Sequence, residues 1–177
     1  MNNFKTLEGA MEMFKNNNCL GTENCIFATF KDTNADGMKA GAAGAIGGAV
    51  GGAIAAFASG MASTLQDGSL QNLNGFEGLL INQTENGLGL IPLNVKGVQL
   101  MLNIDKMEAD PSKFVFVSND NIEEITVKKF NIFNKKVQKV KIVIKGGTTL
   151  RLLAHVSEKN ISYQESNFAK FMNKYSK

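Results

Sequence analysis

The chain has 177 residues, of which 44% are hydrophobic and 20% charged, so it can form one domain with a core, and global disorder is excluded. The formal net charge is +3, but residues 1–94 hold four lysines against eight acids (−4), whereas residues 95–177 hold fourteen lysines and one arginine against eight acids (+7). One histidine and two cysteines exclude the usual four-ligand zinc sites.

The first 22 residues are expected to form an N-terminal helical element. Phe4, Leu7, Met11 and Phe14 fall on one face of a helix over residues 4–16. This segment lacks the basic and apolar regions of a signal peptide. Reduced thiols at Cys19 and Cys25, as in a cytosolic protein, are the favoured interpretation, with a disulfide as the alternative.

A strand is expected over residues 23–30, and it is followed by a segment rich in glycine and alanine. Residues 40–65 form a run of 26 residues without a charge. At helical spacing the large apolar residues lie on one side and small residues on the other. The small-residue series, which suits the close packing of two helices, includes Gly44, Gly48, Gly52 and Gly60.

This glycine segment cannot be a stable helix alone in water. Each glycine costs a helix about 1 kcal/mol relative to alanine, and no polar face is available to meet solvent. The segment is therefore expected to be buried, either in a membrane or in a protein interface. Membrane contact is the preferred interpretation, and a small-residue helix packed in a soluble oligomer or against the domain itself is the alternative.

The rest of the chain is dominated by patterns typical of β-strands and hairpins. Turns are indicated at Glu85-Asn86-Gly87, at Asn134-Lys135 and at Gly146-Gly147. Strands are expected over residues 78–83, 88–93, 97–104, 113–117, 122–133, 137–144 and 148–156.

A C-terminal helix is expected to close the domain. Ser162 and Glu165 fit a capping box, and an apolar stripe follows at helical spacing. That stripe consists of Phe168, Phe171, Met172 and Tyr175. Many short strands followed by one amphipathic helix predict an α+β, mainly β, domain: an antiparallel barrel or bent sandwich capped by the helix.

This order of elements resembles the PH-like superfamily in its bacterial form. The resemblance rests on the strand Glu23–Phe30, the strand pair at Gly78–Ile81 and Leu88–Ile91, Phe114–Val117 leading into Asn121–Ile125, the lysine-rich hairpin and the terminal helix. The Asp-x-Arg-Leu pattern of that family is absent, since Thr84-Glu85-Asn86-Gly87 occupies the region. The resemblance implies a PH-like domain over residues 23–177, with a glycine-zipper insertion at 38–66. It also implies binding of lipid headgroups, peptides or proteins.

A basic patch is the main candidate site. No acidic residue occurs between Ile125 and Val156. The patch expected to attract anionic lipid or a protein partner comprises Lys128, Lys129, Lys136, Lys139, Lys141, Lys145 and Arg151. Lys139, Lys141 and Lys145 share the parity of one strand, so they are expected on one face; a solvated outer face is the alternative. With a single arginine in the chain, nucleic acid is not an expected partner.

No catalytic or metal constellation can be argued from the sequence. His155 has no partner nucleophile, and the glycines match no phosphate-binding loop. The sequence therefore predicts a non-enzymatic, membrane-associated PH-like binding or scaffold module without a cofactor. Its expected location is cytoplasmic, at the inner face of the cell membrane, and the glycine segment predicts a homo-oligomer. The alternative is a structural oligomer or pore-type assembly through the glycine-zipper helix.

Overall fold

The computed structural model describes residues 3–19, 21, 23–30, 70–95, 104–130 and 136–175. Their elements in chain order are α1 (Leu7–Asn16), β1 (Cys25–Phe30), the 3-10 helix η1 (Leu70–Leu73), β2 (Gly78–Gln83), β3 (Gly87–Val95), η2 (Ile104–Lys106), β4 (Met107–Ala109), η3 (Pro111–Lys113), β5 (Val115–Ser118), η4 (Asn119–Asn121), β6 (Ile122–Lys129), β7 (Val137–Ile144), β8 (Thr149–His155) and α4 (Gln164–Tyr175). The predicted glycine-zipper segment, and most of the strand predicted at 97–104, lie outside the described residues.

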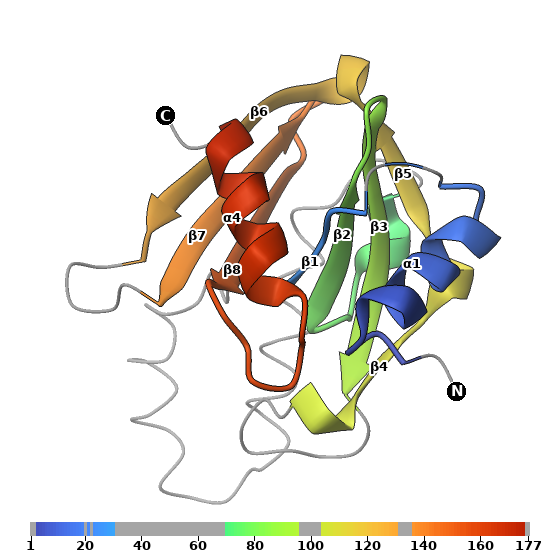
Figure 1. Cartoon of the computed structure of the whole chain (residues 1–177). Helices are drawn as coiled ribbons and strands as arrows, with labels where there is room; N and C mark the ends of the chain where they lie inside the picture. Colours follow the sequence, from blue (N-terminus) through green and yellow to red (C-terminus); the bar gives the residue numbers. More distant parts are fainter. Residues whose placement is uncertain are drawn as a thin grey trace, which may run out of the picture.

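The described strands form one antiparallel sheet in the order β4-β3-β2-β1-β8-β7-β6, and β5 also pairs with β3. The fold is therefore α+β and mainly β, with one helix near each end of the chain, as predicted. The sheet bends so that β6–β8 face β1–β5 across a shared core (Figure 1). The strand predicted at 23–30 is observed as β1, and it pairs with β2 in the register Phe27↔Leu80.

Two turns show why the hairpins form where the sequence indicates. Gly146 and Gly147 have φ angles of 94° and 95°, a left-handed conformation that favours glycine. They connect β7 to β8, and the Ile144 N–H donates to the Thr148 carbonyl across the turn at 2.8 Å. In the β2–β3 turn, the Thr84 hydroxyl accepts the Gly87 N–H at 3.1 Å.

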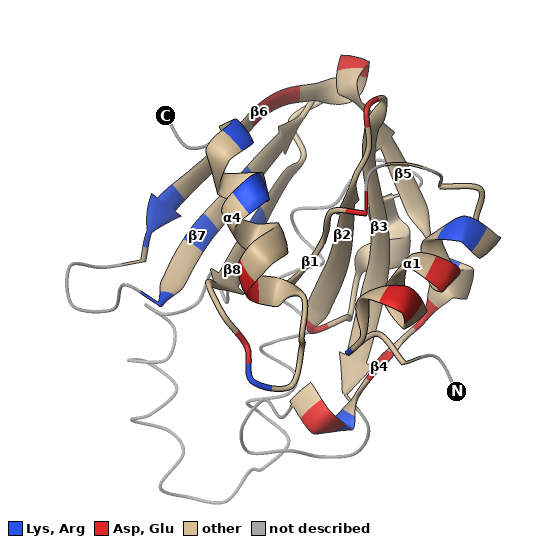
Figure 2. Cartoon of the chain, in the orientation of Figure 1, with Lys and Arg blue, Asp and Glu red and all other residues tan. Residues whose placement is uncertain are grey.

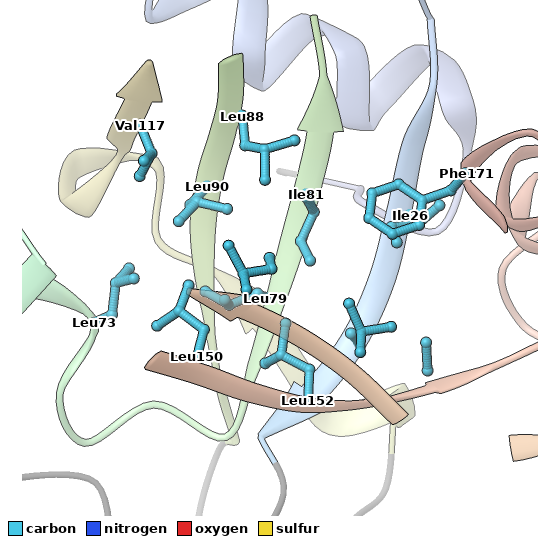
Figure 3. Close-up of a cluster of buried hydrophobic side chains, with 14 of the residues drawn as sticks. Ile26, Leu73, Leu79, Ile81, Leu88, Leu90, Val117, Leu150, Leu152 and Phe171 are labelled. Carbon is cyan, nitrogen blue, oxygen red and sulfur yellow. The ribbon is translucent and has the colours of Figure 1, made fainter. Parts of the chain in front are cut away.

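The main core lies inside the bend of the sheet. Ile81 and Leu90 of one half point toward Leu150 and Leu152 of the other (Figure 3). Leu73 lies on one side of this cluster and Phe171 of α4 on the other. Leu70 and Leu73 belong to a stretch that the sequence pattern treats as a linker, but they are 3% and 0% exposed.

A second core lies on the outer face of β1–β3. Phe4, Met13 and Phe14 at the N-terminus pack over Phe27 and Leu80. Of the predicted α1 stripe, Phe4 and Phe14 are buried, while Leu7 and Met11 are partly buried against the same cluster. Strand β2 is consequently buried on both faces along its whole length.

Helix α4 fills the gap where β1 and β8 separate. These two strands pair only at Thr29 and Phe30. Beyond that point the side chain of Gln164 accepts the Phe27 N–H at 2.8 Å and donates to the Phe27 and His155 carbonyls at 2.9 and 2.8 Å. The Asn167 amide donates to the Cys25 carbonyl at 2.9 Å. Two side-chain amides of α4 thus take the place of strand pairing along β1.

The predicted apolar stripe of α4 also faces the core. Phe168 and Phe171 are fully buried, and Met172 and Tyr175 are partly buried against the same cluster. The helix begins at Gln164, one residue later than a cap at Ser162 requires. No helix within the described ranges is long and apolar enough to cross a membrane.

Replacing Phe171 tests the contribution of this stripe. Phe171→Ala should lower the free energy of unfolding by about 3–5 kcal/mol, because a fully buried ring is lost and a cavity remains. Urea unfolding followed by circular dichroism measures the change. Lys170→Ala, at an exposed position of the same helix, is the control and should change stability by less than about 0.5 kcal/mol. Equal effects of the two substitutions would contradict burial of the stripe.

Replacing Gln164 tests the amide bridge. Gln164→Leu keeps a side chain of similar volume but leaves buried groups of Phe27 and His155 without their partner. Each orphaned group costs about 1–3 kcal/mol, so the expected loss of stability is at least about 3 kcal/mol. Hydrogen exchange should be faster at the Phe27 amide and unchanged at the Leu80 amide in β2. Protection at Phe27 equal to that of the parent protein would show that the bridge is dispensable.

Candidate functional site

The outer face of β6–β8 carries the basic residues predicted from the sequence. Along β7 every second residue is buried, so Val140 and Ile142 point into the core and Lys139 and Lys141 point outward. Arg151 on β8 and Lys128 on β6 are exposed on the same outer face. We call Lys128, Lys139, Lys141 and Arg151 the basic face.

Cations lie directly opposite one another on this face. Lys128 is the cross-strand partner of Lys139, and Lys141 is the partner of Arg151. Like charges directly opposite on neighbouring strands destabilise a sheet. One acid offsets them, since Glu124 accepts from the Lys141 ammonium at 3.3 Å. This ion pair is solvent-exposed, so it contributes little stability.

Phe130 adds an aromatic ring at one end of the basic face. The Lys139 ammonium lies 5.2 Å from the centre of the Phe130 ring, a cation–π contact. Phe130 is half-buried and follows β6, where its N–H donates to the Val137 carbonyl at 3.1 Å. The sequence analysis placed Phe130 in a strand but not in a site. Its two-residue spacing from Lys128 was the available signal.

The remaining predicted patch residues lie at the two ends of the strands. Lys129 ends β6, and Lys136, which precedes β7, accepts the Val156 N–H on its carbonyl at 2.8 Å. Lys145 is not on the strand. It lies in the turn after Ile144, and its N–H donates to the Asn121 carbonyl at 2.9 Å. An eight-residue strand separates Lys136 from Lys145, a distance of about 27 Å.

Charge is divided between the two halves of the fold. Figure 2 shows lysine and arginine on the end of β6 and on β7 and α4, whereas aspartate and glutamate lie on α1, beside β4 and at the start of β6. The division follows the sequence asymmetry, because β6–β8 and α4 all come from the basic second half of the chain. A basic surface of this kind attracts anions by long-range electrostatics.

His155 occupies an exposed end of β8. Its Nδ1 lies 3.2 Å from the Glu158 carboxylate, and its backbone carbonyl accepts from Gln164. The partner of the histidine is thus a carboxylate on the adjoining loop. In the described part of the chain, no group of three or more His, Cys, Asp and Glu residues is arranged to hold a metal ion. The predicted glycine-zipper residues Gly44, Gly48, Gly52 and Gly60 lie outside the described residues.

The two thiols are free and buried beneath α1. Burial raises the pKa of Cys25 from 9.0 to about 12, and its Sγ lies 4.0 Å from the Tyr163 hydroxyl. Burial also raises the pKa of Tyr163, whose hydroxyl donates to the Phe4 carbonyl at 2.7 Å. Both groups are therefore protonated at neutral pH, and Cys25 lacks the thiolate needed of a nucleophile.

Comparison with known proteins gives no further assignment: no family model, no curated protein and no solved structure matches the chain.

The buried thiol makes stability depend on pH in the alkaline range. Between pH 9 and 12 Cys25 ionises in the unfolded chain but stays protonated in the folded protein. The free energy of unfolding should therefore fall above pH 9, by up to about 1.4 kcal/mol per pH unit from this group. Urea unfolding at a series of pH values measures it. In Cys25→Ala the free energy of unfolding should decrease less steeply above pH 9. An unchanged dependence on pH would contradict the assignment of this decrease to Cys25.

Proposed function

We propose that this protein is a non-catalytic PH-like module that binds anionic membrane surfaces through the basic face. The observation that carries the proposal is the cross-strand register, which places Lys128 directly opposite Lys139 and Lys141 directly opposite Arg151. An arrangement that costs stability at an exposed position is expected where a sequence serves binding. The inner leaflet of a cell membrane supplies the matching negative surface.

The PH-like part of the proposal is supported by the strand order. Strands β4 and β5 pair with successive parts of β3 and are separated by η3, so they act as one interrupted strand. Counted in this way, a four-strand meander is followed by a three-strand meander, and α4 closes the sheet. In the described part of the chain, the outer positions of β7 and β8 in the three-strand part are not buried.

Only the residues on either side of the glycine segment bear on the proposal. Phe30 at the end of β1 and Leu70 of η1 flank residues 31–69, and both pack against the main core. These two flanking residues therefore lie on the same side of any membrane. Self-association through Gly44, Gly48, Gly52 and Gly60, or a pore-type assembly, stays a prediction from the sequence.

Charge reversal on the basic face tests the proposal. Lys139→Glu, Lys141→Glu and Arg151→Glu together should weaken binding to phosphatidylserine–phosphatidylcholine vesicles by at least about 100-fold. Each basic residue near such a surface contributes about 1 kcal/mol, and tenfold corresponds to about 1.4 kcal/mol. Vesicle sedimentation at low and high salt measures binding, and the salt dependence should also be lost.

A matched triple variant separates the basic face from net charge. Lys15→Glu, Lys106→Glu and Lys113→Glu change the net charge equally, at exposed positions of α1, η2 and η3 in the other half of the fold. This variant should bind acidic vesicles within a fewfold of the parent protein. Equal losses of vesicle binding in the two triple variants, or no loss in the first, would show that the basic face is an ordinary solvated surface.

A further inference from the structure

Charge is graded along the length of the basic face. Glu123 and Glu124 lie at the start of β6, beside Asp120 of η4, whereas Lys128 and Lys129 lie at its end. Lys145 lies at the acidic end, because its N–H bonds to the Asn121 carbonyl. The opposite end holds Lys128, Lys129, Phe130, Lys136 and Lys139, which we call the Phe130 end.

This gradient favours one orientation of the protein on a negative surface. A flat approach of the whole face would bring Glu123 and Glu124 toward anionic headgroups. An approach by the Phe130 end brings cations and withdraws those carboxylates. Because exposed charges are screened over about 8–10 Å, acids at the far end of a strand about 27 Å long would hardly weaken a contact made at the Phe130 end.

Phe130 gives this end an apolar contact as well. Its half-buried ring lies on the same side of β6 as Lys128 and directly under the Lys139 ammonium. Aromatic side chains flanked by lysines are typical of segments that lie at the headgroup level of a membrane. Phe116 of β5, with 44% of its surface accessible, lies in the other half of the fold, and among the described residues no lysine ammonium lies over its ring.

We propose that the protein contacts anionic lipid with the Phe130 end leading, and that the Phe130 ring enters the headgroup region. This inference rests on the proposed function, and it adds the orientation and an apolar anchor. Lys128 and Lys139, which lie opposite each other on the face that carries the ring, then bind lipid phosphates beside it. Lys145, which the sequence pattern groups with them, stays away from the surface.

Tryptophan fluorescence tests the anchor, because the chain contains no tryptophan. Phe130→Trp and Phe116→Trp each introduce a single reporter. On addition of phosphatidylserine–phosphatidylcholine vesicles, the emission of Phe130→Trp should shift to the blue and be quenched by brominated lipid. Phe116→Trp should show neither change. A response from the residue 116 reporter, or equal responses from both, would overturn the orientation.

Two single reversals test the electrostatic part. Lys128→Glu, at the exposed position opposite Lys139 at the Phe130 end, should weaken binding to the same vesicles at least tenfold. Lys145→Glu at the acidic end should weaken it less than about threefold. Equal losses would favour a flat approach and overturn the inference.

The outcomes separate the two proposals. Vesicle sedimentation of the full chain that depends on Lys139, Lys141 and Arg151, without a change at Phe130→Trp, would refute the orientation and leave the proposed function standing. Failure of the parent chain to sediment with acidic vesicles would refute both. Sedimentation with phosphatidylcholine alone would also count against both, because it would show that the basic face does not drive binding.

Discussion

The fold depends on how the polar groups of β1 are satisfied. This strand is buried on both faces, with Ile26 in the main core and Phe27 beneath α1. One edge pairs fully with β2, but the other pairs with β8 only at Thr29 and Phe30. A buried N–H or C=O without a partner is strongly unfavourable, so the rest of that edge must find donors and acceptors. Gln164 and Asn167 supply them. The sheet can therefore open between β1 and β8, bend around the main core and still leave the backbone of β1 hydrogen-bonded.

The position of the candidate site follows from which half of the sheet is covered. Helix α1, together with Ile161 and Tyr163 from the loop before α4, packs on the outer face of β1–β3. That face is closed to a partner. In β7 and β8 the inner positions are buried and the outer ones are not. The chain places its cations on this uncovered face, where their ammonium groups remain in water.

Much of the fold could be predicted because it is encoded locally. The strands at 78–83 and 137–144 have the predicted bounds, and Gly146-Gly147 forms the predicted turn. Features set by distant contacts could not be predicted in this way. Leu70 and Leu73 stand in a polar stretch, and only the closed sheet shows that they are buried. Gln164 and Asn167 look like ordinary polar helix residues until β1 is placed beside them.

The same limit applies to the candidate site. Alternation along a strand correctly places Lys139 and Lys141 together, because both lie within β7. It fails for Lys145, because the parity rule holds only while the strand continues, and β7 ends at Ile144. The strand predicted at 122–133 was also too long, since β6 ends at Lys129. Contact between Phe130 and Lys139 depends on the register of β6 against β7, which hydrophobic patterning leaves open.

The cross-strand cation pairs are the observation that favours the proposed binding function over solubility alone as the reason for these lysines. A soluble outer face needs polar residues, and alternating acids and bases would serve it while stabilising the sheet by about 0.2–1 kcal/mol per opposite pair. Glu124, which lies opposite Val143 and pairs diagonally with Lys141, shows that an acid is accepted on this face. In contrast, Lys128 opposite Lys139 and Lys141 opposite Arg151 are pairs of like charges, which destabilise the sheet. Their repulsion is relieved when an anion lies over the face, so anion binding stabilises this face relative to the free protein. For this reason the pairs, rather than the number of lysines, support an anionic surface as the partner.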